Sequence, residues 1–401
     1  MKYKLYIIFY IISTTLFSQN TNKIFNSGHS DNKDFKVTLP YEIRGGLLVV
    51  KAEIKNDIYN LIFDTGAVTT ISKEMHEKLN LKKIKTGKVS DISDTKKELS
   101  FSVIDTIKIG GINFYDIGTA ILDVDSIQDF KCMKIDGFLG SNLLKEAIWE
   151  IDMKKKEITF SNSLTSFQLS ENTPKTKLYI GYGGVPSVTT YLDNNKLYNT
   201  VIDYGFGGNI SLLKDDFNKI IKKNSNIKYT KAIGSSIASV YGDLPSREYF
   251  QAIINQYKID NFLIPEQLIS FGSINSRVIG NGFLRDYKVI LSWKDKSAWF
   301  IKNYKTKEPV SFKTFGYGFQ RKNNEIYISS IYENSESSNK GLKLGDKILK
   351  INTEDYTNIT NERWCEIINT PRADKQNIVI ERKGEKMNFD LDKKILIQKN
   401  N

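Results

Sequence analysis

The 401-residue sequence predicts a mainly β protein, made of two tandem β-rich units followed by a small α+β unit. Two observations lead to this prediction. A series of strand-like runs and glycines occurs twice, with the copies about 140 residues apart, and the composition changes after residue 310. The length exceeds what one hydrophobic core normally organises, and a hydrophobic content of 40% with 22 Phe and 21 Tyr is sufficient for several β-rich cores.

The first copy centres on Asp64, which follows the apolar run at residues 61–63 and is itself followed by Thr65 and Gly66. An apolar run of this kind predicts a strand that is buried on both faces. Gly66 allows the backbone to turn sharply just after the acid. A carboxylate at the end of a buried strand is costly unless it is paired or used, so Asp64 is a candidate functional residue.

The second copy centres on Asp203, which lies 139 residues downstream and is followed by Tyr204 and Gly205. In both copies a glycine pair and a strand-like run precede the acid. In both copies an apolar pair ending in glycine comes later, at Gly140 and at Gly280, which lie 76 and 77 residues after the respective acid. So many landmarks in register indicate an internal duplication.

The remaining elements of the two copies are predicted from their own patterns. Ser72 is a candidate N-cap for a short helix, and Gly110 with Gly111 forms the turn of a hairpin. The expected elements are helices at 73–79 and 212–222, a hairpin at 103–117, polar hairpins at 86–99 and 234–242, strand pairs at 147–160 and 288–300, and a polar connector at 161–176.

A third unit begins near residue 310. It opens with the glycine-rich loop Gly316-Tyr317-Gly318-Phe319 and continues with Gly-Leu-Lys-Leu-Gly-Asp-Lys-Ile-Leu-Lys-Ile-Asn at 341–352. A helix is predicted at 361–369, and a final hairpin is predicted from strands at 377–382 and 386–391. Successive backbone N–H groups in a glycine-rich loop can hold a chain-terminal carboxylate while the peptide adds as a strand to the sheet edge.

The first two units resemble aspartic proteases. Asp-Thr-Gly-Ala at 64–67 with the later Gly140 segment is similar to retropepsin-like proteases, and two such units in one chain resemble the bilobal pepsin-like layout, over roughly 36–305. The resemblance implies acid-protease-type β-barrel lobes at 36–163 (lobe 1) and 174–305 (lobe 2), with the hairpins at 86–99 (tip near 91–94) and 234–242 in the flap positions. It also implies a set of site residues: catalytic Asp64 and Asp203, with Thr65, Gly66, Gly140, Gly205 and Gly280 supporting the active-site loops.

Tyr204 departs from this family pattern, because a Thr or Ser is expected between the second Asp and its Gly. In the family that hydroxyl helps to lock the two loops together. The tyrosine phenol could reach the partner loop by a different route, or its bulk could block closure.

The third unit, at 310–396, is similar to a PDZ domain. Gly316, Tyr317, Gly318 and Phe319 match the carboxylate-binding loop of that family, and the 341–352 segment matches its internal signature. The resemblance implies docking of peptide C-termini. The alternative is a PDZ fold that serves as a rigid appendage.

The predicted chemistry needs two carboxylates and neither a metal nor another cofactor. Two buried carboxyls at close range share one proton, so that the pair can activate water and protonate the substrate oxygen. The sequence has two histidines, His29 and His76, which is too few for His-based zinc sites or most nucleophile–His triads, and we expect both on the surface. Asp123, Asp125 and Asp129 lack the pattern of an EF-hand loop and are expected to form a solvated acidic loop.

The N-terminus predicts export. Lys2 and Lys4 precede an apolar run at 5–17, so residues 1–18 are typical of a secretory signal peptide and are short for a transmembrane helix. Leu16 is not the small residue preferred near a cleavage site, which leaves an uncleaved anchor open. We expect a periplasmic or extracellular protein that starts near Gln19, has a flexible leader at 19–35, and makes no stable membrane insertion after cleavage.

The charge distribution bears on whether the protein binds nucleic acid, and the cysteine content bears on whether it forms disulfides. The net charge of +12 is spread along the chain without an arginine-rich tract, so a solvated lysine-rich surface is expected and nucleic-acid binding is not. Cys132 and Cys365 fall in different predicted domains, and both are expected to be free and buried.

Three hypotheses therefore remain after the sequence. The first is a monomeric bilobal endopeptidase that acts on polypeptides and docks peptide C-termini through the third unit. The second is a protease in which lobe 1 acts only as a homodimer and lobe 2 is inert. The third is a non-catalytic peptide-binding protein with a degenerate cleft.

Overall fold

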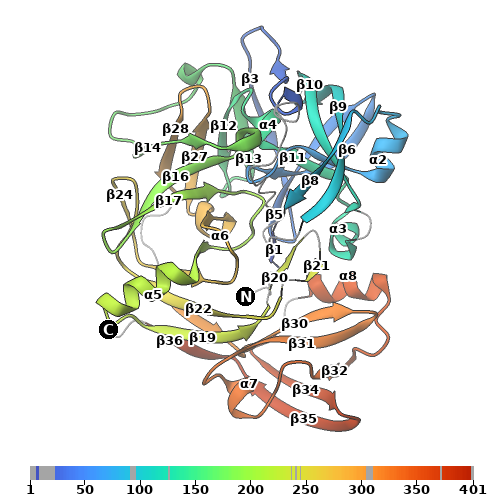
Figure 1. Cartoon of the computed structure of the whole chain (residues 1–401), viewed down its shortest axis with the longest axis vertical. Helices are drawn as coiled ribbons and strands as arrows, with labels where there is room; N and C mark the ends of the chain where they lie inside the picture. The colour runs from blue at the N-terminus through green and yellow to red at the C-terminus, as the bar shows by residue number, and fades with distance from the viewer. Residues whose placement is uncertain are drawn as a thin grey trace.

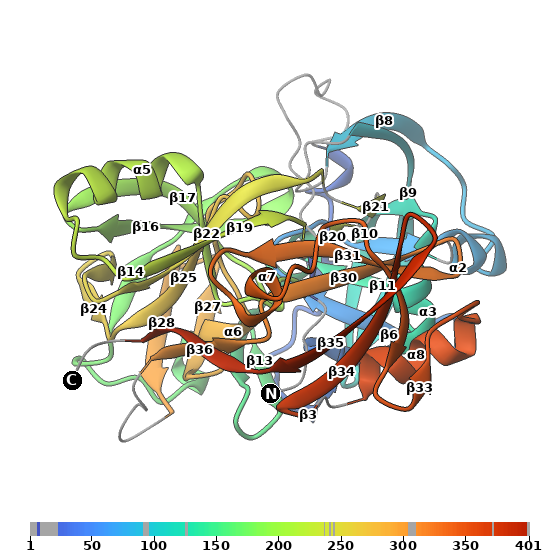
Figure 2. The ribbon, with the colours of Figure 1, turned by 90° about the horizontal axis from the view of Figure 1, so that it is seen from below.

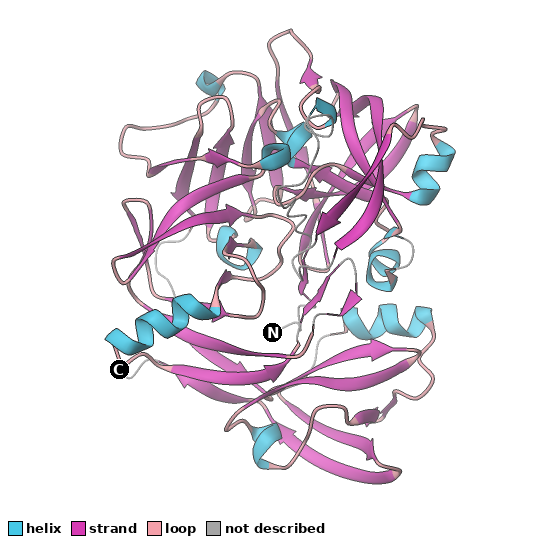
Figure 3. Ribbon diagram, in the orientation of Figure 1, coloured by secondary structure: helices cyan, strands magenta, loops and turns pink. Residues whose placement is uncertain are grey.

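The structure is a computed structural model that describes residues 6–8, 23–90, 96–124, 127–235, 237–239, 242–243, 245–303, 310–370 and 373–398. Strands predominate, as predicted, and the described helices are short (Figure 3). The two lobes lie side by side, and the third unit lies beneath both of them in the view of Figure 1.

Lobe 1 is built on one sheet, because its apolar runs alternate with tight turns. The order of the strands is β2-β10-β7-β11-β6-β5-β9-β8, with β4 paired to β5. The bounds are β2 His29–Ser30, β4 Glu42–Arg44, β5 Leu47–Ile54, β6 Asp57–Asp64, β7 Thr70–Ser72, β8 Lys85–Ser90, β9 Lys96–Ile109, β10 Ile112–Leu122 and β11 Gly137–Gly140; the helices are α2 Lys73–Lys78, α3 Gln128–Met133 and α4 Ser141–Leu144.

Lobe 2 repeats the arrangement. Its strands run in the order β24-β23-β16-β17-β26-β18-β25-β22-β19, with β15 paired to β16. The bounds are β15 Tyr179–Ile180, β16 Pro186–Leu192, β17 Asn195–Ile202, β18 Ile210–Leu212, β19 Tyr229–Gly234, β22 Arg247–Ile254, β23 Tyr257–Ile259, β24 Phe262–Ile264, β25 Gln267–Phe271 and β26 Val278–Ile279; the helices are α5 Lys214–Lys223 and α6 Asn281–Leu284.

A six-stranded sheet joins the two lobes. The strand pairs predicted at 147–160 and 288–300 meet here, because β12 of lobe 1 pairs antiparallel with β27 of lobe 2, with Trp149 opposite Leu291. A buried apolar cluster runs through both lobes. The order is β14-β28-β27-β12-β13-β3, with β3 Lys36–Pro40, β12 Ile148–Asp152, β13 Glu157–Ser161, β14 Lys175–Lys177, β27 Tyr287–Ser292 and β28 Ser297–Lys302.

The third unit continues the sheet of lobe 2. Its strand β31 pairs antiparallel with β19, beside which it lies in the view from below (Figure 2). In this pairing Gly234 lies opposite Ser330. The predicted helix at 361–369 is present with those bounds. The elements are β29 Ser311–Thr314, β30 Tyr317–Lys322, β31 Glu325–Tyr332, α7 Glu336–Asn339, β32 Lys347–Ile351, β33 Glu354–Asp355, α8 Asn361–Asn369, β34 Lys375–Arg382, β35 Glu385–Asp392 and β36 Lys394–Gln398.

The third unit also contacts lobe 1, where helix α3 packs against α8 (Figure 1). The expectation that Cys132 and Cys365 are free and buried is wrong. They form a disulfide between these two helices, with Cα atoms 5.0 Å apart, and both are partly exposed. The fold brings together two helices that are distant in sequence, which spacing alone does not reveal.

The acidic loop around Asp123 differs from expectation in one respect. Asp129 is 9% exposed and lies in α3, where its Oδ1 accepts a hydrogen bond of 2.5 Å from the Trp364 indole of α8. Burial against the third unit, rather than solvation, therefore characterises Asp129. Asp125 lies outside the described residues.

The N-terminal region is described in part. Residues 23–35, expected to be flexible, pack against lobe 1, because Phe25 is buried and the short strand β2 pairs with β10. Two apolar residues in an otherwise polar stretch, Ile24 and Phe25, supply the contact. Of the predicted signal peptide, the structure describes Tyr6–Ile8 (β1), which pairs with β20 Ile237–Ser239; β20 also pairs with β21 Gly242–Asp243. No helix within the described ranges is long and apolar enough to cross a membrane.

Candidate active site

Asp64 and Asp203 stand at the ends of matching strands. Strand β6 ends at Asp64, and β17 ends one residue before Asp203. The later apolar-apolar-glycine segments lie parallel to these strands, with Gly140 beside Asp64 in β11 and Ile279 beside Ile202 in β26. The duplicated apolar runs therefore build the same local structure twice, and each presents one acid at the boundary between the lobes.

The two acid loops cross at their glycines. A Cβ atom on Gly66 would overlap the carboxyl of Asp203, and a Cβ atom on Gly205 would overlap the carboxyl of Asp64. Each acid thus lies against the glycine of the opposite loop, which no larger residue could replace without displacing the carboxyl. Both acids are fully buried. The structure brings the two sequence-predicted acids together within one chain.

The carboxyl oxygens have two distinct environments. The Oδ1 atom of Asp64 accepts a hydrogen bond of 2.8 Å from the Gly66 N–H, and the Oδ1 atom of Asp203 accepts one of 2.7 Å from the Gly205 N–H. The two Oδ2 atoms are buried and have no hydrogen-bond partner among the described residues. A shared proton between the acids fits this pattern.

The electrostatics favour a pair that keeps a proton. Burial raises the pKa of Asp64 well above its usual value, and the negative charge of Asp203 raises it further. Burial also raises the pKa of Asp203, to about 7, while backbone N–H donors and the hydrogen bond from Asp64 oppose that rise. The shared proton therefore belongs to the pair rather than to either acid alone.

Thr65 locks the two loops from one side. Its hydroxyl donates to the Ile202 carbonyl at 2.6 Å and accepts from the Tyr204 N–H at 3.0 Å. Both bonds are buried and join lobe 1 to lobe 2. The reciprocal hydroxyl, which a Thr or Ser at position 204 would supply, is missing, yet the loops meet.

The position of the Tyr204 side chain answers a question that the sequence left open, namely whether its bulk blocks closure of the loops. Its ring is fully buried and packs edge-on against Phe63 with centroids 5.8 Å apart. Its hydroxyl has no hydrogen-bond partner among the described residues, and burial raises its pKa. The ring therefore fills the core beneath the site and does not prevent closure of the loops.

Two residues that sequence reasoning did not single out hold the loops in place. The Ser141 hydroxyl donates to the Thr65 carbonyl at 2.5 Å, and the Asn281 amide donates to the Tyr204 carbonyl at 2.9 Å. They directly follow Gly140 and Gly280. Their equivalent positions in the two copies could have identified them from the sequence, although one residue is Ser and the other is Asn.

The predicted flap regions are described in part. The hairpin at 86–99 is formed by β8 and β9, but its tip, residues 91–95, lies outside the described residues. The region at 234–242 lies between β19 and β22, which pair with each other, and it contains the described strand β20.

The glycine-rich loop of the third unit is only partly arranged as a donor cradle. Gly316 has a φ of +92°, which favours glycine, and its N–H donates to the Thr314 hydroxyl at 3.0 Å. Tyr317 is buried, and its hydroxyl accepts from Gln376 at 2.5 Å. Gly318 and Phe319 belong to β30, which pairs with β31.

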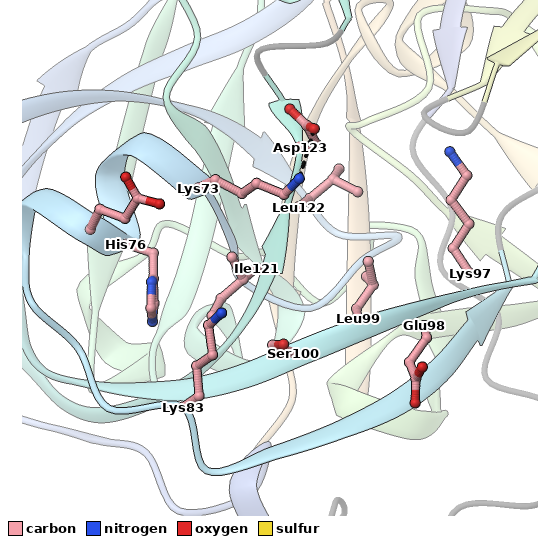
Figure 4. A pocket seen from close by; sticks show the side chains of 11 residues that line it. Lys73, His76, Lys83, Lys97, Glu98, Leu99, Ser100, Ile121, Leu122 and Asp123 are labelled. Carbon is pink, nitrogen blue, oxygen red and sulfur yellow. Dashed lines mark hydrogen bonds and ion pairs between the residues drawn. The ribbon is translucent and has the colours of Figure 1, made fainter.

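A separate cavity of about 350 Å³ lies in lobe 1 between α2 and β9 (Figure 4). Neither Asp64 nor Asp203 lines it. His76, expected on the surface, lines this cavity and is 8% exposed, because α2 packs this face against the lobe. Burial and the nearby Lys83 lower the pKa of His76. His29 is exposed, as expected.

Comparisons with known proteins match two parts of the chain. The aspartyl protease family model matches residues 50–143, which contain Asp64 and Gly140, and the PDZ domain model matches residues 305–380, which contain the Gly316 loop. No curated protein is significantly similar to the chain. Among solved structures, soybean basic 7S globulin aligns with 9% identity and a TM-score of 0.40 over 67% of this chain and 95% of its own.

Proposed function

We propose that this protein is an exported aspartic-type endopeptidase with one active site per chain. The observation that supports the proposal best is the buried pair of Asp64 and Asp203, each lying against the glycine of the opposite loop. The aspartyl protease match covers the first acid, and the duplication extends the inference to the second.

The proposed mechanism uses the shared proton. The ionised carboxylate takes a proton from a water molecule, whose oxygen attacks the scissile carbonyl carbon, while the protonated carboxyl delivers its proton to the carbonyl oxygen. The tetrahedral intermediate then collapses. One hydroxyl of the intermediate gives its proton to the ionised carboxylate, the C–N bond breaks, and the amine nitrogen takes a proton from the protonated carboxyl. The carboxyl product forms, and the pair again holds one proton.

The test measures cleavage of a random peptide library by the wild type, with and without a pepstatin-type inhibitor. The same assay is run on Asp64→Asn and Asp203→Asn, and the mass of each variant in solution is measured. The matched control is Asp105→Asn, an exposed acid on β9. In a site formed within one chain, either site variant removes nearly all cleavage from a monomer. Retained activity in Asp203→Asn that rises with dimerisation would instead support the lobe 1 homodimer. Inactivity of the wild type would support the non-catalytic alternative.

We further propose that the third unit docks peptide C-termini, on the support of the PDZ match and the Gly316 loop. Amidating the C-terminus of a bound peptide should weaken binding by about 1–3 kcal/mol, because charge-assisted hydrogen bonds to the carboxylate are lost. Equal affinity of the amidated and free-acid peptides would contradict this role and favour the rigid appendage.

Export is part of the same proposal. The N-terminal pattern motivates it, and the Cys132–Cys365 disulfide is of the kind that persists in oxidising compartments such as the periplasm or the cell exterior. N-terminal sequencing should find a mature chain that starts near Gln19. Soluble cytosolic protein that retains Met1 would contradict it.

A further inference from the structure

We propose that Ser141 and Asn281 are positioning residues that aim the backbone donors of the two acids. Each side chain donates to the carbonyl of a peptide group whose N–H, at the other end of the same group, donates to the acid. This inference rests on the proposed function, and it names two residues that tune the ionisation of the same pair.

In lobe 1 the connection runs through the peptide group between Thr65 and Gly66. The Ser141 hydroxyl donates to the Thr65 carbonyl, and the Gly66 N–H donates to Asp64 Oδ1 at 2.8 Å. A peptide group is planar and trans, so its C=O and N–H point in opposite directions. Fixing the carbonyl on one side therefore fixes the direction of the N–H that meets the acid.

In lobe 2 the same connection is built from a different residue. The Asn281 amide donates to the Tyr204 carbonyl at 2.9 Å, and the Gly205 N–H donates to Asp203 Oδ1 at 2.7 Å. The Asn281 amide also donates to the Gly46 carbonyl of lobe 1 at 3.2 Å. It thereby holds the second acid loop and ties that loop to the opposite lobe.

The backbone N–H of each positioning residue donates a second hydrogen bond to the same acid loop. The Ser141 N–H donates to the Ala67 carbonyl at 2.7 Å, and the Asn281 N–H donates to the Phe206 carbonyl at 2.8 Å. Each acid loop is thus held at two equivalent carbonyls, one and three residues after its acid. The recurrence in both lobes, with different side chains, indicates a shared geometric requirement.

These bonds act in a buried environment. Ser141 is 0% exposed and Asn281 is 1% exposed. At low local dielectric, hydrogen bonds in a chain polarise one another, so a donor on the carbonyl strengthens the N–H as a donor to the acid. A stronger donor favours the ionised carboxylate and lowers its pKa. The two side chains therefore oppose the rise in pKa that burial imposes on the pair.

The variant that tests this is Ser141→Ala, with Ser141→Thr as the conservative rescue. The matched control is Ser102→Ala, since the Ser102 hydroxyl is also fully buried and donates to a backbone carbonyl, of Lys82 at 2.8 Å, away from the acids. The acidic limb of the kcat/KM profile should move up by roughly 0.3–1 pH unit in Ser141→Ala. The acidic limb should return to its wild-type position in Ser141→Thr, and it should stay at the wild-type position in Ser102→Ala.

A second measurement separates this inference from the proposed function, because it needs no activity. The melting temperature of each variant is measured from pH 4 to pH 8. The deficit of Ser141→Ala relative to the wild type should grow with pH, because the ionised acid loses part of its stabilisation, whereas the deficit of Ser102→Ala should stay constant. A pH-independent deficit equal to that of Ser102→Ala would overturn the inference even if the enzyme is active. A growing deficit without any cleavage would sink only the proposed protease.

Discussion

At the scale of single residues, the site is defined by what each acid lies against. The carboxyl of Asp203 occupies the space that a side chain on residue 66 would fill, and Asp64 does the same at residue 205. Burial of both carboxyls disfavours their charged forms. Keeping the two acids buried therefore lowers the stability of the fold, and the size of this loss depends on pH because it grows as the carboxyls ionise.

Asp203→Asn should stabilise the fold at neutral pH. The folded pKa of Asp203 is about 7, above the value near 4 expected for an unfolded Asp, so the native state binds more protons between these limits and wild-type stability falls as pH rises from about 4 to about 7. The neutral amide escapes this loss. Denaturant unfolding should show the variant more stable by roughly 2–4 kcal/mol at pH 7.5 and no more stable at pH 4. A constant difference across pH would contradict the raised pKa.

Activity should be greatest near neutral pH. Catalysis needs one ionised and one protonated carboxyl, and the pKa of Asp203 near 7 delays the first ionisation of the pair. Ala67 and Phe206 follow the two loops where side-chain donors to the acids would lower that value, and neither has one. The kcat/KM profile of peptide cleavage should rise toward neutral pH. A maximum near pH 2 would contradict the raised pKa, because the first ionisation would then lie even below that of a solvated Asp.

Tyr204→Phe should preserve both stability and cleavage. The phenol hydroxyl is buried and has no partner among the described residues, so its removal relieves an unsatisfied group, whereas the ring remains packed on Phe63. Tyr204→Thr, which restores the family hydroxyl, should instead lose about 3–5 kcal/mol through the cavity left by the ring. Chemical denaturation of both variants checks this. A destabilised Tyr204→Phe would reveal a role for the hydroxyl.

At the scale of elements, local patterns predicted most of the fold. The helix at 361–369 was predicted with its observed bounds, and Ser72 caps α2 by accepting from the Met75 N–H, as expected. Helix α3 was not predicted, because its segment is acidic and short, and its buried Asp129 accepts a hydrogen bond from Trp364 of a helix that is distant in sequence. The positions of Ser141 and Asn281 were visible in the sequence, but the directions of their side chains depend on loops folded by the opposite lobe.

The junction between β19 and β31 makes its own prediction. Gly234 has a φ of +120°, and a Cβ atom there would overlap the Ser329 carbonyl in β31. Gly234→Ala should therefore separate these strands locally. Hydrogen exchange should speed up at the Glu333 N–H, which donates to the Lys231 carbonyl across the junction, and at the Ser235 N–H. Unchanged exchange at both amides would show that the junction tolerates the methyl group. Gly384→Ala, at a φ of +84° but with open space around it, is the control for backbone strain alone.

At the scale of the whole molecule, the third unit is attached to both lobes. It extends the lobe 2 sheet through β31, and it contacts lobe 1 through α3 and α8. The sequence indicated three units but not this arrangement, because contacts between units depend on surfaces that assemble only after each unit has folded. The disulfide between α3 and α8 makes the attachment to lobe 1 covalent.

Cys365→Ser should lower the free energy of unfolding by about 2–4 kcal/mol, because the disulfide closes a long loop in the unfolded chain. Thermal melts of the wild type and the variant, each with and without reductant, measure the effect. Reductant should bring the wild type to the level of the variant and leave the variant unchanged. If the oxidised wild type and Cys365→Ser melt together, the cross-link contributes nothing to stability.

The same disulfide matters for self-cleavage, because a protein that is proposed to cut polypeptides can also be cut by other copies of itself. A single cut between Cys132 and Cys365 would leave two fragments that remain covalently joined. A cut in a loop would also leave intact the pairing of β12 with β27 between the lobes and the pairing of β19 with β31 between lobe 2 and the third unit. A nicked molecule would migrate as one species without reductant and as two with it. Autolysis in this protein would thus escape detection by native mass, and the nicked form would keep both acids in one particle.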